Sequence, residues 1–244
     1  MKKFFEKSEI WFALFWIALY VCSMTFLRNL GDDSPVMMAG LIVISALMLL
    51  FVVRNGLTDY YGLAGWAKNS RAMLWFIPLW IIAGCNLLNG IGPDYEVPGL
   101  IFAVISMAFV GFAEEMIFRG FLFKAMLKGG SVKTAVIVSS VTFGIGHIGN
   151  LLTGHELGET LLQIVYAVAV GFVFTLAFYK GGSLLPCILS HSLTDVFAVL
   201  GRDGGSSWLN VTAHVAVIAL AAVYCLYLTR VKTPPADGTG EKKA

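Results

Sequence analysis

Four of the ionisable side chains inside the long apolar segments of this chain are of types that suit acid–base chemistry on a water molecule. They are Glu114 in the stretch EEMIFRG, His147 in FGIGH, and His191 and Asp195 in HSLTD. A carboxylate or an imidazole can take a proton from water, and a hydrogen-bond donor can stabilise a developing oxyanion. Ionisable groups inside a membrane are costly and by default indicate a functional site that faces the protein interior. We therefore treat these residues as candidate catalytic groups.

The spacing of the charged residues separates two tasks. Glu115 and Arg119 are four positions apart, so on a helix they share a face and can form an ion pair. Glu114 points about 100° away from Glu115 around the helix, which leaves it for another task. His191 and Asp195 are again four positions apart and project together. A structural network of ion pairs explains Glu115 and Arg119 alone, but three such motifs on three apolar segments favour a functional site.

Two chemical routes are open to these residues. In the first, Glu114 is a general base that takes a proton from water, and the imidazoles orient the water and polarise the carbonyl. In the second, His147 and His191 hold zinc together with Glu114 or Asp195, and an open position remains for water. The chain has no HExxH, the strongest signature of a zinc hydrolase. We therefore favour the route without a cofactor and keep zinc as the alternative.

Other side chains receive simpler interpretations. Neither Ser nor Cys is paired with His in a recognisable motif, so a covalent nucleophile is not indicated. Gly144, Gly146 and Gly149 flank His147, and their small size predicts a close approach of helices. His214 stands alone in the last apolar segment and is expected to be a hydrogen-bonded packing residue.

The elements that position the candidate residues are membrane helices. The chain has 244 residues, 58% of them hydrophobic and 13% charged, and a mean hydropathy of +0.80, which is too apolar for a water-soluble globule. We expect an all-α polytopic membrane protein of about eight transmembrane helices around a polar intramembrane chamber. The predicted spans are residues 9–27, 36–53, 72–91, 98–118 (continuing to about 128), 134–152, 160–179, 183–200 and 208–228.

The distribution of basic residues predicts the orientation. With eight spans, most lysine and arginine residues fall on the side of both termini, whereas the other side has only Arg28 and Arg202 among many acids. The positive-inside rule then places both termini in the cytoplasm. Depth counted along the helices at about 1.5 Å per residue puts the candidate residues in the inner or middle bilayer. We therefore expect the chamber to open to the cytoplasm and the substrate to enter laterally or from that side.

At these motifs the sequence resembles the CAAX protease and bacteriocin-processing family, also called CPBP or Abi. EEMIFRG is similar to the family's EExxxR motif, FGIGH to its FxxxH motif and HSLTD to its HxxxN/D motif, all between residues 98 and 200. The resemblance implies an intramembrane endopeptidase that cuts a membrane-associated protein or peptide, prenylated in the related type II CAAX enzymes.

The resemblance also implies roles for single residues. Glu114 and His147 would activate the attacking water, and His191 with Asp195 would stabilise the oxyanion. In the eukaryotic CAAX enzymes that this sequence resembles, the last position of the HxxxN/D motif is asparagine. A carboxylate at Asp195 must be protonated, or bind a cation, before it can replace an amide donor.

Competing functions and the organisation of the chain complete the expectations. A bacteriocin-immunity or scaffold membrane protein without turnover is one alternative, and a proton-coupled transporter is another, although we find no internal repeat of the kind many transporters have. No cluster of basic and aromatic residues indicates nucleic acid binding. We predict one membrane-embedded domain over residues 1–230, a disordered cytoplasmic tail over 231–244, and residence in a bacterial plasma membrane.

Overall fold

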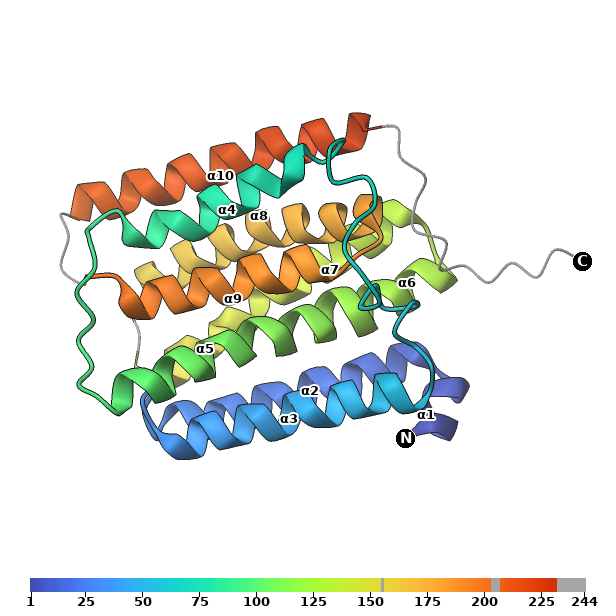
Figure 1. Cartoon of the computed structure of the whole chain (residues 1–244), viewed down its shortest axis with the longest axis horizontal. Helices are drawn as coiled ribbons and strands as arrows, with labels where there is room; N and C mark the ends of the chain where they lie inside the picture. The colour runs from blue at the N-terminus through green and yellow to red at the C-terminus, as the bar shows by residue number, and fades with distance from the viewer. Residues whose placement is uncertain (155, 203–206, 232–244) are drawn as a thin grey trace, which may run out of the picture.

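The protein is a bundle of helices whose long axes run roughly parallel (Figure 1). The computed structural model describes residues 1–154, 156–202 and 207–231. Within these ranges the chain is all-α, as predicted, and the one β-type bridge joins Ile91 to Gly201. The tail expected to be disordered lies outside the described residues from position 232 onward.

All eight predicted spans correspond to helical segments. Six of these segments are long and apolar enough to cross a membrane, and the two around α4 and α9 are shorter. The protein is therefore an integral membrane protein. The helices are α1 (Lys2–Lys7), α2 (Glu9–Arg28), α3 (Pro35–Arg54), η1 (Leu74–Phe76), α4 (Ile77–Gly84), η2 (Cys85–Leu87), α5 (Gly99–Glu115), the π-helix η3 (Met116–Phe123), α6 (Lys124–Gly129), α7 (Val132–Gly146), the 3₁₀ helix η4 (His147–Thr153), α8 (Leu157–Gly181), α9 (Leu185–Leu200) and α10 (Ser207–Arg230).

Local sequence signals set several helix ends. The hydroxyl of Ser8 accepts a hydrogen bond from the Trp11 amide at the start of α2, and Ser131 does the same for Thr134 at the start of α7. These hydroxyls satisfy amides that have no partner inside the helix. Helix α8 ends at Gly181 and is capped by Gly182, whose φ of 70° lies in the left-handed region that glycine adopts without strain.

Two glycines let the helices that carry the motifs cross closely. A Cβ on Gly111 of α5 would lie 2.4 Å from the Ser192 amide nitrogen of α9. A Cβ on Gly144 of α7 would lie 2.3 Å from a methyl carbon of Val168 on α8. The expected close approach is therefore confirmed at Gly144. It is wrong for Gly146 and Gly149, because a Cβ there would meet nothing within 4 Å.

The bundle has a basic end and an acidic end, each held together by contacts between elements. At the basic end, Lys128 of α6 pairs with Glu9 at 2.6 Å, and the Tyr60 hydroxyl also donates to Glu9. Burial, followed by the hydrogen bond and charge of Glu9, raises the pKa of Tyr60 well above its ordinary value, so this hydroxyl stays protonated as a donor. The basic end carries Lys2, Lys3, Lys7, Arg54, Lys68, Arg71, Lys124, Lys128, Lys133, Lys180 and Arg230.

The acidic end lies at the other tips of the same helices. Arg202 donates its backbone amide to the Gly90 carbonyl at 3.0 Å, and Gly92 donates to Leu200 at 3.1 Å, so the chain after α9 is tied to the loop after η2. This end carries Asp32, Asp33, Asp94, Glu96, Glu156 and Glu159, with Arg28 and Arg202 as its cations. In Figure 1 the N-terminus and α1 lie at the basic end, opposite the start of α5.

Candidate active site

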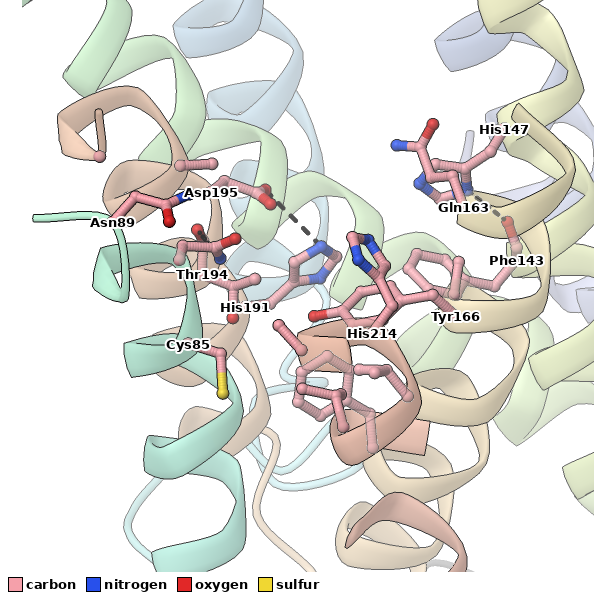
Figure 2. Close-up of a pocket in the computed structure, with 18 of the residues that line it drawn as sticks. Cys85, Asn89, Phe143, His147, Gln163, Tyr166, His191, Thr194, Asp195 and His214 are labelled. Carbon is pink, nitrogen blue, oxygen red and sulfur yellow. Dashed lines mark hydrogen bonds and ion pairs between the residues drawn. The ribbon is translucent and has the colours of Figure 1, made fainter. Parts of the chain in front are cut away.

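Three candidate residues meet where α5 and α9 cross. The Nε2 atom of His191 lies 3.7 Å from Glu114 Oε2 and 3.6 Å from Asp195 Oδ2. Glu114 is the penultimate residue of α5, and the other two lie one helical turn apart on α9. The predicted common face of His191 and Asp195 is therefore confirmed, and Figure 2 shows their side chains facing one another.

His147 reaches the same region from a third helix. It is the first residue of η4, where α7 tightens into a 3₁₀ helix. The predicted span 134–152 is confirmed as the apolar segment Val132–Leu151, with this change of winding inside it. Glycines before and after His147 disfavour regular α-helix, which accounts for the change. The ring Nδ1 lies 3.3 Å from the Phe143 carbonyl one turn earlier. Figure 2 places His147 and Gln163 across the cavity from Asp195.

Glu115 binds two partners from the protein interior. Arg119 donates from Nη1 to Glu115 Oε1 at 2.6 Å, which confirms the predicted pair, and both side chains are fully buried. The same oxygen lies 2.9 Å from His191 Nδ1, a contact that spacing along one helix could not reveal. A hydrogen bond at this distance to a carboxylate requires a proton on Nδ1, so Glu115 sets the orientation of the imidazole. Nε2 is then directed at Glu114 and Asp195.

Arg119 is held by aromatic rings as well as by Glu115. Its guanidinium carbon lies 4.1 Å from the centre of the Phe143 ring and 5.3 Å from that of Phe174. Two of its nitrogens, Nε and Nη2, have no hydrogen-bond partner, so the faces of the rings are the groups that meet the rest of this cation. Phe174 also stacks on His191 at 5.5 Å, which joins the cation and the imidazole into one packed unit.

The helix that carries the first motif changes its winding directly after Glu115. Residues Met116–Phe123 form a π-helix, in which hydrogen bonds run from i to i+5 and the backbone is wider than in an α-helix. The Phe118 carbonyl accepts a hydrogen bond from the Ser139 hydroxyl of α7 at 2.9 Å. Such π segments occur frequently at functional sites, and this one carries the arginine of EExxxR.

Tyr20 is a site residue that the sequence analysis missed. Its hydroxyl donates to Glu114 Oε1 at 2.9 Å from α2, and its side chain is 5% exposed. Glu114 therefore has a donor on one oxygen and His191 near the other. The available signal was a lone tyrosine in the middle of the predicted span 9–27, where its hydroxyl needs a buried partner.

Two cavities meet at His147. The smaller holds about 70 Å³ and is lined by Glu114, Tyr20 and His147, with Arg28 and Asn150 farther along and with Gly146 and Gly149 in its wall. The larger holds about 400 Å³. Its lining includes His147, His191, Asp195, Asn86, Asn89, Gln163, Tyr166 and His214. Since a water occupies about 30 Å³ in the liquid, the smaller cavity suits a water beside Glu114 and the larger suits a segment of another molecule.

His214 packs as predicted and has a further place in the site. Its ring packs on Tyr166 with centroids 5.4 Å apart, but it also lines the larger cavity, so it is more than a packing residue. A chain of side chains joins the cavities along another path. Arg28 donates to Asn150 at 2.7 Å, and Asn150 donates to Gln163 at 2.6 Å.

The larger cavity lies toward the acidic end of the bundle. Its lining comes from η2, the second half of α9, the middle of α8 and the first half of α10, and Ala198 and Arg202 are its exposed members. The sequence predicted an opening at the opposite, basic end, and the direction of the opening is taken up below. Counting residues along a helix gives depth, but it does not show which end of the site the neighbouring side chains close.

The described residues do not assemble a metal site. Over these ranges, no group of three His, Cys, Asp or Glu side chains is arranged so that it could hold a metal ion. His191 Nδ1 is engaged by Glu115, and His147 Nδ1 faces the Phe143 carbonyl. The zinc alternative that the sequence offered stays a prediction.

The serines beside His191 are engaged elsewhere. Ser190 donates its hydroxyl to the Leu79 carbonyl at 3.0 Å, and Ser192 donates to the Ala108 carbonyl at 2.7 Å. Both hydroxyls serve helix packing rather than an imidazole, which agrees with the absence of a nucleophile motif from the sequence.

Comparison with known families covers the part of the chain that bears the motifs. Residues 96–197 match the family model of the type II CAAX prenyl endopeptidase Rce1-like proteins. This segment, which is less than half of the chain, is similar to the Rce1-like family. At the level of the family, the match supports a membrane-embedded protease with a membrane-associated protein substrate. No curated protein and no solved structure matches the chain.

The Rce1-like segment contains Glu114, Glu115, Arg119, His147, His191 and Asp195. Tyr20, Arg28 and His214 lie outside it, on α2 and α10. The helices beyond the family segment therefore contribute side chains to the two cavities rather than serving only as a scaffold.

Proposed function

We propose that this Rce1-like protein hydrolyses a peptide bond of a membrane-associated protein or peptide, with Glu114 as the general base. The observation that carries the proposal is the position of Glu114. Its carboxylate lines a water-sized cavity, accepts from Tyr20 on one oxygen and has His191 near the other. The larger cavity, which holds the substrate in this proposal, begins at the same histidines.

The proposed reaction proceeds through a tetrahedral intermediate. Glu114 takes a proton from the water in the smaller cavity, with His147 orienting that water, and the oxygen attacks the carbonyl carbon of a peptide bond in the larger cavity. His191, doubly protonated, donates from Nε2 to the oxyanion while its Nδ1–H donates to Glu115. Glu114 then returns its proton to the leaving nitrogen as the carbon–nitrogen bond breaks, which restores the carboxylate.

Asp195 has a supporting part in this proposal. Its Oδ2 lies 3.6 Å from His191 Nε2 and has no hydrogen-bond partner. As a carboxylate it stabilises the imidazolium, and as a carboxylic acid it donates to the oxyanion, which is the task of the amide in the asparagine form of the motif.

The test is the change Glu114→Gln, which removes the base and keeps the volume. We expect cleavage to fall by at least about 100-fold, in line with the usual contribution of general-base catalysis. Comparison of the membrane-derived and secreted peptides of cells making the wild-type protein or Glu114→Gln identifies the cleaved substrates. Glu96→Gln, an exposed glutamate in the loop before α5, is the matched control. Wild-type turnover in Glu114→Gln would remove Glu114 from the mechanism.

We propose further that no metal takes part. The arrangement of the described histidines and carboxylates supports this, because they engage one another and the backbone rather than a common centre. The purified protein should keep its activity in strong chelator and contain no stoichiometric zinc by elemental analysis. One zinc per chain, with activity lost on its removal and restored on its return, contradicts this part of the proposal.

A further inference from the structure

The larger cavity reaches the surface at the acidic end of the bundle. Arg202, at the mouth, is exposed and follows the last turn of α9, and Ala198 one turn earlier is exposed as well. Asn86 on the facing wall donates its side-chain amide to the Thr194 carbonyl of α9 at 2.9 Å. The helix η2 and the second half of α9 are therefore fixed to each other in the wall of the cavity.

Toward the basic end, the space below the candidate residues is filled. On α9, the positions that precede His191 on its inward face are Ser190, Cys187 and Leu184, all completely buried. Cys187 packs against α8, where its thiol lies 3.4 Å from the Phe174 carbonyl. A peptide cannot pass this side of α9 without displacing packed core.

Aromatic residues of the π-helix η3 also fill the space between the candidate residues and the basic end. The ring of Phe121 contacts those of Phe12 and Tyr61, with centroids 5.1 Å and 5.2 Å apart, and Phe123 contacts Phe178 at 6.0 Å. All five rings are at most 3% exposed. These residues separate Glu114 from the basic end with a dense apolar layer, which neither water nor a polar backbone crosses readily.

The charges at the two ends of the bundle indicate which face of the membrane the closed, basic end meets. The basic end is where a bacterial membrane protein faces the cytoplasm, because lysine and arginine in short loops are retained on that side. The acidic end then faces outward. Orientation from charge and closure from packing are independent observations, and together they contradict entry from the cytoplasm.

We propose that the active-site cavity opens to the non-cytoplasmic face, and that the substrate is a polypeptide segment presented at that face of the membrane. The reacting water enters through the same mouth, since hydrocarbon supplies none. The substrate part of this inference rests on the proposed protease function, whereas the direction of the opening does not.

Cysteine labelling tests the direction without turnover. The four native cysteines are replaced by alanine or serine, and one cysteine is introduced as Ala198→Cys or Ala213→Cys, both in the wall of the larger cavity. Gly129→Cys marks the basic end, because this residue is exposed and an added Cβ meets nothing within 4 Å. A membrane-impermeant maleimide is added to right-side-out or to inverted vesicles.

We expect Ala198→Cys and Ala213→Cys to be labelled at least tenfold faster in right-side-out vesicles, and Gly129→Cys faster in inverted ones. Faster labelling of all three from the same side, or equal labelling of the cavity positions from both sides, overturns the inference. If the cysteine-free background folds poorly, the added labelling of Ala198→Cys over the native protein gives the same comparison. Detergent-solubilised protein exposes both faces, so loss of cleavage there in Glu114→Gln tests the catalytic proposal separately.

Discussion

At the scale of single residues, two adjacent glutamates have divided tasks because a helix rotates them apart. Glu115 points into the bundle, where Arg119 and His191 use the same oxygen. Glu114 points into the smaller cavity, where Tyr20 and the water-sized space surround it. One carboxylate thus positions the imidazole, and the other is free to exchange a proton.

The hydroxyl of Tyr20 is expected to position Glu114. Tyr20→Phe removes one donor from Glu114 and keeps the ring, so we expect kcat to fall by about 10-fold, the scale of a hydrogen bond to a charged group, with KM little changed. Tyr224→Phe is the matched control, because that buried hydroxyl donates to the Met73 carbonyl at 2.7 Å, away from the site. A role in folding alone would make the two variants equally unstable and equally active.

Glu115→Gln should affect both folding and catalysis. It leaves the buried Arg119 without its counter-charge, which typically costs about 3–5 kcal/mol, and it releases the hydrogen bond that orients His191. Thermal unfolding in detergent should show a clearly lower midpoint than Glu114→Gln, together with lost cleavage. An unchanged midpoint would mean that the pair adds nothing to stability.

At the scale of elements, the sequence was sufficient where apolar length or local spacing decides the structure. All eight predicted spans are helical, and the pair Glu115–Arg119 forms as predicted. The sequence was insufficient where a contact between residues far apart in the chain decides the local structure. The π-helix after Glu115 depends on Ser139 of another helix for one of its carbonyls, and the donor to Glu114 is Tyr20, 94 positions earlier.

The crossing of α5 and α9 should control the distance between the base and the imidazole. Gly111→Ala places a Cβ about where the Ser192 backbone lies, so the helices must separate and His191 must move away from Glu114. We expect a loss of about 1–3 kcal/mol in stability and a larger relative loss of cleavage. Gly84→Ala, where an added Cβ meets nothing within 4 Å, is the control and should leave both unchanged. Wild-type activity in Gly111→Ala would show that the crossing is not critical.

At the scale of the whole molecule, the charge asymmetry and the packing asymmetry are aligned. The end with most lysine and arginine is the end that buried aromatic rings close, and the acidic end is the one where the larger cavity reaches the surface. The sequence predicted the charge asymmetry, and the charged residues that the structure describes lie at the expected ends. The packing asymmetry required knowledge of which side chains pack together, as Phe121 does with Phe12 and Tyr61 from two other segments.

This alignment predicts that cleavage depends on the side from which substrate is supplied. A fluorogenic peptide that carries a cleavage sequence found by the proteomic comparison should be cut by sealed right-side-out vesicles. In sealed inverted vesicles the activity should stay latent until detergent opens the membrane, because the aromatic layer of η3 closes the exposed end. The two preparations should have equal rates in detergent, which controls for the amount of enzyme. Full activity in sealed inverted vesicles would mean that the peptide crosses the layer, and that the packed side chains around Phe121 and Phe123 open during the reaction.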